Sequence, residues 1–521
     1  MASWTMYWGS CKSRLSAISR NCFLSRMRWR KRCLAFKRLW SKEKARRVRC
    51  EVSLEEMKRE NGQLRFQLRA TERQSKLAKP PSPDWESALE TAVPNHTFPL
   101  GLIVLSVNLA RVIGLRPTVS VLKIFFDWLG IPCKIPTYQT VRTWMQRIGL
   151  YRMLRAPQVD DGIWLVDHSM QIGKQKVLLV LRVRESRLPP KGTPLRHEDV
   201  EVLCFQAGEE WKREDVLQVY KTVAAKYGHP LSVVTDGAVE LREPAERLKN
   251  KGKSPLVNRD LKHFLANRLE ELLAKLPEWK EFMEELLKTR AKVQQTEMAH
   301  LSPPSLKQKA RFMNLQPTLN WAMMVLWHLQ HFASKARQGI TVARMEDKFG
   351  WLRKFESWIH QWKECQDVIS TALTFFNGNG VFRGSASAFR KMSGGVRYDS
   401  SRKLLEATIA FIRNIEKKLK VRQRLPISTE ILESTFGLYK KIEQQHAKGG
   451  FTSLLPVFPT LLKPTTTEEV RKCFARVKTK DVTQWLKTNL PDTLAARRQR
   501  AYREANPKSK SKGATQMSAA A

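Results

Sequence analysis

Three β-rich segments follow one another in this sequence with no helical segment between them, and the pattern then changes to alternating helices and strands. The three segments are residues 163–167, 175–184 and 200–205, and they carry the β-branched and other apolar residues typical of buried strands. Two amphipathic segments then alternate with two short apolar ones, at 212–227, 231–237, 239–250 and 255–258. This order predicts an antiparallel three-stranded meander that continues into strands joined by helices.

A meander followed by such alternation is the element order of a ribonuclease H-like fold with a mixed five-stranded sheet. In that topology the first strand lies centrally and the fourth lies beside it. Asp167 ends the first strand and Asp236 ends the fourth, so the two acids are expected close together. An acid at the tip of a buried strand is costly unless it binds a metal or a cation. Each also has an ordinary explanation, since Asp167 could cap a loop and Asp236-Gly237 is a common turn dipeptide.

A third acid is needed if the site holds two divalent ions, because such ions require several anionic oxygens. Glu433 is the candidate, on a helix expected from about residue 428. Lys440 lies two turns further along the same face, where it could contact a DNA phosphate. Glu430 lies one turn before Glu433 and is the alternative, since acids are common near helix starts for dipole reasons alone.

Four motifs together resemble the catalytic core of DDE transposases of bacterial insertion sequences. They are Leu-Val-Asp167-His-Ser-Met-Gln-Ile-Gly-Lys, Val-Thr-Asp236-Gly, Arg259-Asp-Leu-Lys-His263 and Ile-Leu-Glu433-Ser-Thr-Phe-Gly437. The resemblance covers roughly residues 162–458. One departure is that some of these enzymes carry a Tyr and an Arg shortly before the Glu, where this chain has Pro426 and Thr429.

The resemblance implies that Asp167, Asp236 and Glu433 are catalytic and bind Mg²⁺ or Mn²⁺, as two ions, and that Lys440 contacts DNA. One ion would activate water or a 3′ hydroxyl, and the other would stabilise the leaving oxygen. Three neighbouring residues are weaker candidates. His168 and His263 are candidate proton carriers, although a structural or phosphate-contacting role is the commoner one, and Asp260 is either a supporting metal-site residue or the N-cap of a helix.

The charge of the chain points to a polyanionic partner. Lys and Arg number 93 against 49 Asp and Glu, a formal charge of +44. DNA fits better than a membrane, because the longest apolar stretch, residues 98–115, contains Asn108 and Arg111. The eight cysteines show no zinc-site or CxxC spacing, and Cys204 falls within a predicted core strand. A reduced, cytoplasmic setting is therefore expected, and the resemblance to transposases of insertion sequences implies a bacterial, nucleoid-associated protein.

Residues 98–155 predict a helical, helix-turn-helix-like domain with helices at 100–113, 119–129 and 137–148. The last helix has an apolar side and a polar, basic side, which suits a recognition helix. The residues expected to contact DNA are Gln139, Thr140, Arg142 and Arg147. An ordinary helical bundle with a basic exterior is the alternative.

The rest of the chain divides by composition. No acid precedes Glu43, so the first segment is a DNA-gripping arm or, alternatively, a transit peptide, and an apolar repeat after it predicts a short coiled coil or a solvated single helix. The expected divisions are a basic arm (1–52), the coiled-coil candidate (53–78), a linker (79–97), the helical domain (98–155), the first part of the core (160–260), a mainly helical insertion (261–426), completion of the core with the Glu433 helix (427–490) and a basic disordered tail (491–521).

The function predicted from these features is transposition: metal-dependent cleavage of DNA at the ends of an element and transfer of the cut strand into target DNA. The expected partners are the terminal inverted repeats, the target DNA and a second copy of the chain, as a homodimer or a higher synaptic oligomer. Two alternatives remain open. One is a DNA-binding regulator or architectural protein on the same fold, and the other is a metal-dependent nuclease that stops after hydrolysis.

Overall fold

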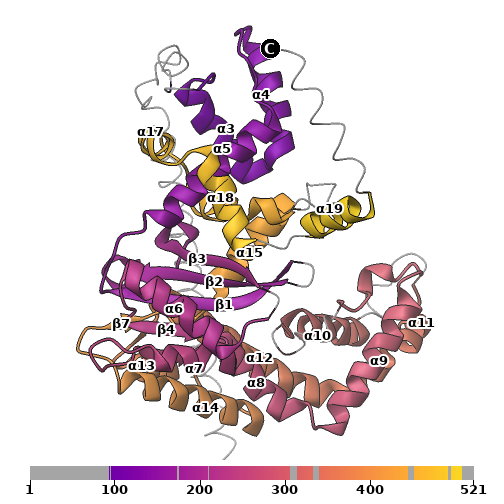
Figure 1. Ribbon diagram of the computed structural model, residues 1–521. Coiled ribbons are helices and arrows are strands. Elements are labelled where there is room, and N and C mark those ends of the chain that lie inside the picture. Colours follow the sequence, from indigo (N-terminus) through magenta and orange to yellow (C-terminus); the bar gives the residue numbers. More distant parts are fainter. Residues whose placement is uncertain are drawn as a thin grey trace, which may run out of the picture. The chain divides into compact units, whose positions relative to one another are not determined.

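The computed structural model describes residues 93, 96–172, 175–208, 210–305, 312, 314–331, 340–443, 451–490 and 494–506 (Figure 1). All the described residues belong to the unit Ala88–Ala521. The predicted basic arm, the coiled-coil candidate and most of the linker lie outside the described residues.

A mixed five-stranded sheet forms, as predicted. Its strands are β1 (Gly162–Ile172), β2 (Gln175–Arg184), β3 (Val200–Gly208), β4 (Ser232–Thr235) and β5 (Leu256–Arg259). Their order is β3-β2-β1-β4-β5. The first three strands pair antiparallel, whereas β4 is parallel to β1 and β5 is parallel to β4. The prediction that the first strand is central and the fourth lies beside it is confirmed.

Both faces of the sheet are covered, which explains why β1 is an almost continuous apolar run rather than an alternating one. Trp164 and Val166 pack against α6 (Arg213–Tyr227) and α7 (Val239–Arg247), which lie together on one face (Figure 1). Ile163 and Leu165 point to the other face and join a larger core with residues of the remaining helices. Successive side chains of a strand alternate between faces, so Asp167 lies on the same face of the sheet as Ile163 and Leu165.

The other helices belong to three stretches of the chain. The N-terminal ones are α3 (Leu100–Ile113), α4 (Leu115–Leu129) and α5 (Tyr138–Leu154). The middle ones are α8 (Leu261–Leu273), α9 (Pro277–Val293), α10 (Gln316–His331), α11 (Val342–Phe349), α12 (Glu356–Asn379), α13 (Ser385–Ser393) and α14 (Asp399–Glu416). The C-terminal ones are α15 (Glu430–Glu443), α16 (Phe458–Leu462), α17 (Thr467–Arg476), α18 (Thr479–Asn489) and α19 (Leu494–Ala505). None of the helices in the described ranges is long and apolar enough to cross a membrane.

The three N-terminal helices occur where the sequence predicts them, with two differences in length. The second begins at Leu115 rather than Val119, because Pro117 lies in its first turn, where a missing N–H costs no helical hydrogen bond. The third continues to Leu154 because its second half is buried. It packs against β3, α16 and α17, so α5 is part of the core of this unit.

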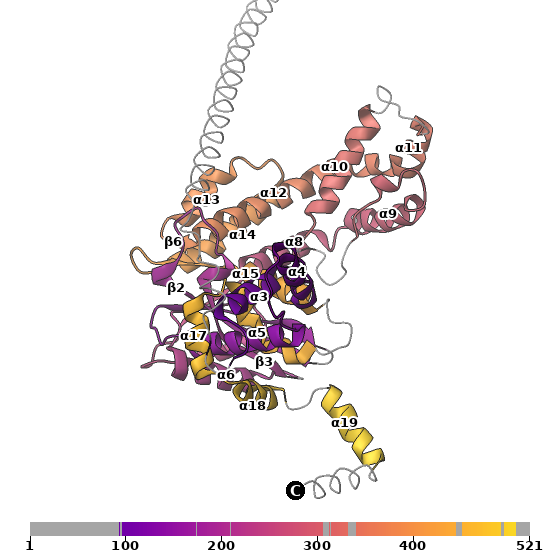
Figure 2. The same cartoon turned by 90° about the horizontal axis from the view of Figure 1, so that it is seen from above.

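The predicted helical insertion consists of α8 to α14, and α12 lies beside α14 (Figure 2). The sequence did not predict the short ladder between β6 (Val381–Phe382) and β7 (Arg424–Leu425). Its two-residue strands are too short to leave a periodic signal in the sequence.

The predicted disordered tail needs a correction at its start, because residues 494–505 form the helix α19. The segment Leu494-Ala-Ala-Arg-Arg-Gln-Arg-Ala consists of residues with high helix propensity. Residues 497–506 of this helix and its end are exposed, which explains why the sequence shows no apolar periodicity there. Residues 507–521 lie outside the described part.

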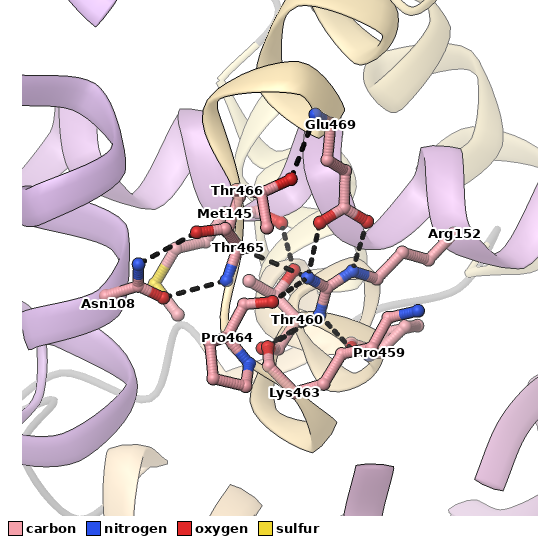
Figure 3. A network of polar contacts seen from close by, with 10 residues as sticks. All are labelled: Asn108, Met145, Arg152, Pro459, Thr460, Lys463, Pro464, Thr465, Thr466 and Glu469. Atoms are coloured by element: carbon pink, nitrogen blue, oxygen red, sulfur yellow. Dashed lines mark hydrogen bonds and ion pairs between the residues drawn. The ribbon is translucent and has the colours of Figure 1, made fainter. Parts of the chain in front are cut away.

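Arg152 joins the N-terminal helices to the C-terminal part of the chain (Figure 3). Its guanidinium binds both carboxylate oxygens of Glu469 at 2.8 Å. It also donates to the hydroxyl of Thr465 and to four backbone carbonyls, those of Pro459, Thr460, Lys463 and Pro464. The side chain is only 7% exposed. Nearby, a Cβ on Gly149 would lie 1.8 Å from the Pro456 carbonyl oxygen, so close contact between the two parts requires glycine there.

We predict that Arg152→Met destabilises the protein by about 3–5 kcal/mol, because it leaves the Glu469 carboxylate and four carbonyls without their donor. Urea unfolding of the full chain, followed by tryptophan fluorescence, measures the change. The control is Lys472→Met, which removes an exposed ion pair with Glu468 on the same helix as Glu469. A similar loss of stability in both variants would contradict a special role for Arg152.

Candidate functional site

Three acids lie in one row at the carboxyl-terminal edge of the sheet. Leu165 on β1 is in register with Val234 on β4, and Val234 is in register with Asn258 on β5. Because these three strands run parallel, the residues two positions further on, Asp167, Asp236 and Asp260, follow one another across the edge. The alternation of β1 places Asp167 on the face of Ile163 and Leu165, the face that α15 contacts. Asp167 and Asp260 are buried and Asp236 is half-buried.

Asp260 forms hydrogen bonds with three elements: the end of β4, the start of α8 and the residue before α15. Its backbone N–H donates to the Thr235 carbonyl at the end of β4. One carboxylate oxygen accepts from the His263 N–H at 2.8 Å, as the N-cap of α8, and lies 2.9 Å from Nδ1 of the His263 ring. The other accepts from the Thr429 N–H at 2.6 Å and from its hydroxyl at 3.0 Å, just before α15 begins. The N-cap interpretation of Asp260 is therefore confirmed, and the contact with Thr429 goes beyond it.

The charge of Asp260 is held by its partners. Burial raises the pKa of this carboxyl, but the hydrogen bonds and charge of His263, with the Thr429 N–H, outweigh it and leave the pKa below its usual range. For His263, burial lowers the pKa, and the hydrogen bond and charge of Asp260, with the charges of Asp236 and Asp167, bring it above its usual value. His263 thus lies in the electrostatic field of all three acids, which favours the charged form of its ring.

Asp236 occupies a tight turn, so the turn interpretation of Asp236-Gly237 is confirmed. A carboxylate oxygen of Asp236 accepts from the Ala238 N–H at 2.8 Å. Gly237 has φ +97°, and a Cβ there would lie 2.8 Å from Nε of Arg259, which donates to the Asp236 carbonyl at 3.3 Å. The turn and the row of acids are compatible, because the turn holds the Asp236 carboxyl at the edge of the sheet.

Glu430 and Glu433 lie in the first turn of α15, and a lysine of α8 approaches both. The Lys262 Nζ is 2.8 Å from an oxygen of Glu433 and 3.8 Å from an oxygen of Glu430. Glu430 also accepts a hydrogen bond from the Asn377 amide. The two glutamates are 37% and 43% exposed, more than Lys262 at 20%.

The residues do not form a complete metal site in this arrangement. Nowhere in the described ranges do three or more His, Cys, Asp or Glu side chains form a group that could hold a metal ion. Asp167 and Asp236 are neighbours by register, but Glu433 contacts Lys262 and Asp260 is engaged by His263 and Thr429. The role of Asp167, Asp236 and Glu433 as metal ligands stays a prediction.

His168 points away from the row of acids. Its Nε2 is 3.2 Å from a carboxylate oxygen of Glu240 on α7, and the side chain is 15% exposed. This position agrees with the alternation of β1, since His168 follows Trp164 and Val166 on the face covered by α6 and α7. The structural interpretation of His168 is favoured over the proton-carrier one.

Of the predicted DNA-contacting residues, Arg147 needs a correction. It is 5% exposed, its guanidinium donates to the carbonyls of Val477 and Phe474, and it stacks 3.9 Å from the centre of the Phe474 ring. The helical period placed Arg147 on the polar side of α5. At this position α17 and α18 pack against that side. Such long-range packing leaves no local pattern in the sequence. Gln139 and Lys440 are exposed, and Thr140 and Arg142 are half-buried. For these four, DNA binding stays a prediction.

Two residues at the junction of α8 and α15, Lys262 and Thr429, were not predicted from the sequence. Lys262 lies between Asp260 and His263 in the motif Arg259-Asp-Leu-Lys-His263. Its position in the first turn of a helix that begins beside the acids could have identified it as a site residue. Thr429 carried no such signal, because its contact with Asp260 joins parts of the chain 169 residues apart.

Comparison with known proteins adds little to this picture. No protein-family model and no curated protein sequence matches the chain. A solved structure described as the Drosophila P element transposase strand transfer complex is similar to it, with 10% sequence identity and a TM-score of 0.38, over 77% of this chain and 100% of that one. A likeness this distant does not determine the fold or the activity.

We predict that His263 makes stability depend on pH above neutrality. A raised pKa in the folded state means that the stabilisation is complete below the unfolded pKa, about 6.5, and is lost as pH rises through the folded value. Stability of the unaltered protein should therefore fall as pH rises from about 6.5, and His263→Gln should lack this component. Urea unfolding at a series of pH values tests this, with His360→Gln, an exposed histidine of α12, as the control. An unchanged pH profile in His263→Gln would rule the idea out.

Proposed function

We propose that this chain is a DDE transposase with a ribonuclease H-like core. The observation that carries the proposal is the register of β1 and β4, which makes Asp167 and Asp236 neighbours at one edge of a β3-β2-β1-β4-β5 sheet. Two buried or half-buried carboxylates side by side repel each other unless a cation lies between or beside them. In a chain of formal charge +44, such a pair supports metal-dependent cleavage of a nucleic-acid backbone.

The proposed reaction is cleavage of DNA at the ends of an element and joining of the free 3′ hydroxyl to target DNA. Asp167 and Asp236 would supply the anionic oxygens for Mg²⁺ or Mn²⁺, and Glu433 or Glu430 would complete the set. In this arrangement the third carboxylate does not join the first two, because Glu433 is paired with Lys262. Assignment to bacterial insertion sequences, and a dimer that holds two DNA ends, are parts of the same proposal.

A DNA-binding regulator on the same fold is the second candidate. The ion pair between Lys262 and Glu433 favours this candidate. A protein that binds DNA without cutting it needs no carboxylate free for a metal, so a lysine can neutralise Glu433 without loss of function. The two candidates differ in whether the carboxylates are needed for function.

Substitution of the acids distinguishes transposase, nuclease and regulator. The substrate is DNA carrying any inverted repeats found beside the coding region, with Mg²⁺ or Mn²⁺. We expect the unaltered protein to cut and join it, and Asp167→Asn and Asp236→Asn each to lower both steps by about 10²–10³-fold or more, with DNA binding retained. Glu433→Gln and Glu430→Gln, measured side by side, identify the third acid.

The control for this series is Asp347→Asn, which alters an exposed acid of α11 that pairs with Lys348. Hydrolysis without joining would support the nuclease, and specific binding without cleavage would support the regulator. Full activity of Asp167→Asn would contradict the proposed site altogether.

The predicted DNA contact of Lys440 has a separate test in the salt dependence of binding. If Lys440 neutralises one phosphate, Lys440→Ala should weaken binding to all sequences alike and reduce the slope of log K against log salt by about 1. Fluorescence anisotropy between low and moderate salt measures this slope. Lys472→Ala, whose ammonium is already paired with Glu468, is the control, and equal slopes for Lys440→Ala and the unaltered protein would exclude the contact.

A further inference from the structure

Lys262 lies where a cation is expected beside the carboxylates of α15. Its Nζ is 2.8 Å from Glu433 and 3.8 Å from Glu430, so one ammonium contacts two acids in the first turn of the same helix. The lysine side chain is more buried than either glutamate, with 20% exposed against 43% and 37%. It is therefore held by the fold, whereas the glutamates extend toward solvent.

The position of Lys262 follows from how α8 and α15 are joined. Asp260 caps α8 and binds the N–H and hydroxyl of Thr429, and the Leu261 N–H donates to the Ile427 carbonyl at 2.9 Å. These contacts bring the first turns of the two helices together. A side chain at position 262 then faces the first turn of α15 without any further adjustment of the backbone.

The same contacts place Lys262 next to the row of acids. It follows Asp260 by two residues, and its neighbour His263 lies in the electrostatic field of Asp167 and Asp236. A lysine at this position would weaken the binding of a divalent ion in two ways. Its charge repels the ion, and its ion pair occupies the carboxylate that the ion would need.

We propose that Lys262 is a positioning residue that holds Glu433 away from Asp167 and Asp236 and competes with a divalent metal for it. The inference rests on the proposed function and adds to it a defined obstacle that metal binding must overcome. An ion pair between partly exposed groups is weak, so a divalent ion shared by several carboxylates can displace the ammonium.

Binding of Mn²⁺ to the full chain without DNA tests this proposal, because it needs no turnover. Free Mn²⁺ is measured by electron paramagnetic resonance during a titration. We expect Lys262→Met to bind Mn²⁺ about fivefold more tightly than the unaltered protein, the factor that corresponds to the upper range of an exposed ion pair, and Lys262→Gln to behave alike. The matched control is Lys288→Met, which removes a lysine 2.8 Å from Glu285 on α9 and should leave the affinity unchanged.

A second substitution shows whether the effect passes through Glu433. Adding Glu433→Gln to Lys262→Met should abolish the gain in Mn²⁺ affinity, which a loss of packing at residue 262 would not explain. Equal or weaker Mn²⁺ binding in Lys262→Met, or no measurable binding to either protein, would overturn the proposal.

Failure of the inference and failure of the proposed function are distinguishable. If Asp167→Asn and Asp236→Asn weaken Mn²⁺ binding but Lys262→Met leaves it unchanged, the metal site stands and the role of Lys262 falls. If neither aspartate substitution affects Mn²⁺ binding in either background, the proposed function falls and the role of Lys262 falls with it.

Discussion

The buried carboxylate of Asp260 is the interaction on which the arrangement of the site depends. It accepts hydrogen bonds from His263 and Thr429, and its own N–H donates to the last residue of β4. The bonds from the N–H groups of His263 and Thr429 satisfy backbone donors at the starts of helices, where such donors have no partner within their own helix. Because the carboxylate is almost completely buried, its partners are also what keeps it charged. The end of the sheet, the start of α8 and the start of α15 are therefore joined at one residue, Asp260.

Three arginines of the described unit bind groups inside it rather than facing solvent. Arg152 binds Glu469 and four carbonyls, Arg147 binds two carbonyls and a phenyl ring, and Arg182, 1% exposed, binds Glu201 and the carbonyls of Pro157 and Tyr227. A planar guanidinium with five donors can satisfy several carbonyls at once, which an ammonium cannot do as well. The composition still indicates a polyanionic partner, but a count of cations overstates the surface that such a partner would contact.

The acids that follow the strands and the acids on α15 are positioned by different parts of the structure. Asp167, Asp236 and Asp260 are in a row because β1, β4 and β5 share a register, and the hydrogen bonds of the sheet leave the backbone little freedom. Glu430 and Glu433 are placed instead by the packing of α15 on α8. Movement of a helix by part of a turn would change which of the two glutamates faces the sheet, so the backbone holds Glu430 and Glu433 in place less firmly than the strand-borne aspartates.

The sequence by itself determined the sheet and its two central acids. The apolar runs of β1, β2 and β4 and the order of strands and helices predicted the topology, and that topology made Asp167 and Asp236 neighbours before any contact was known. These signals are local, since each strand carries its own pattern. The tertiary structure alone decided the burial of Arg147, the bond between Asp260 and Thr429 and the pairing of Lys262 with Glu433. Each of these joins residues more than 160 positions apart, at ends and faces of helices whose sequences are compatible with exposure as well as with burial.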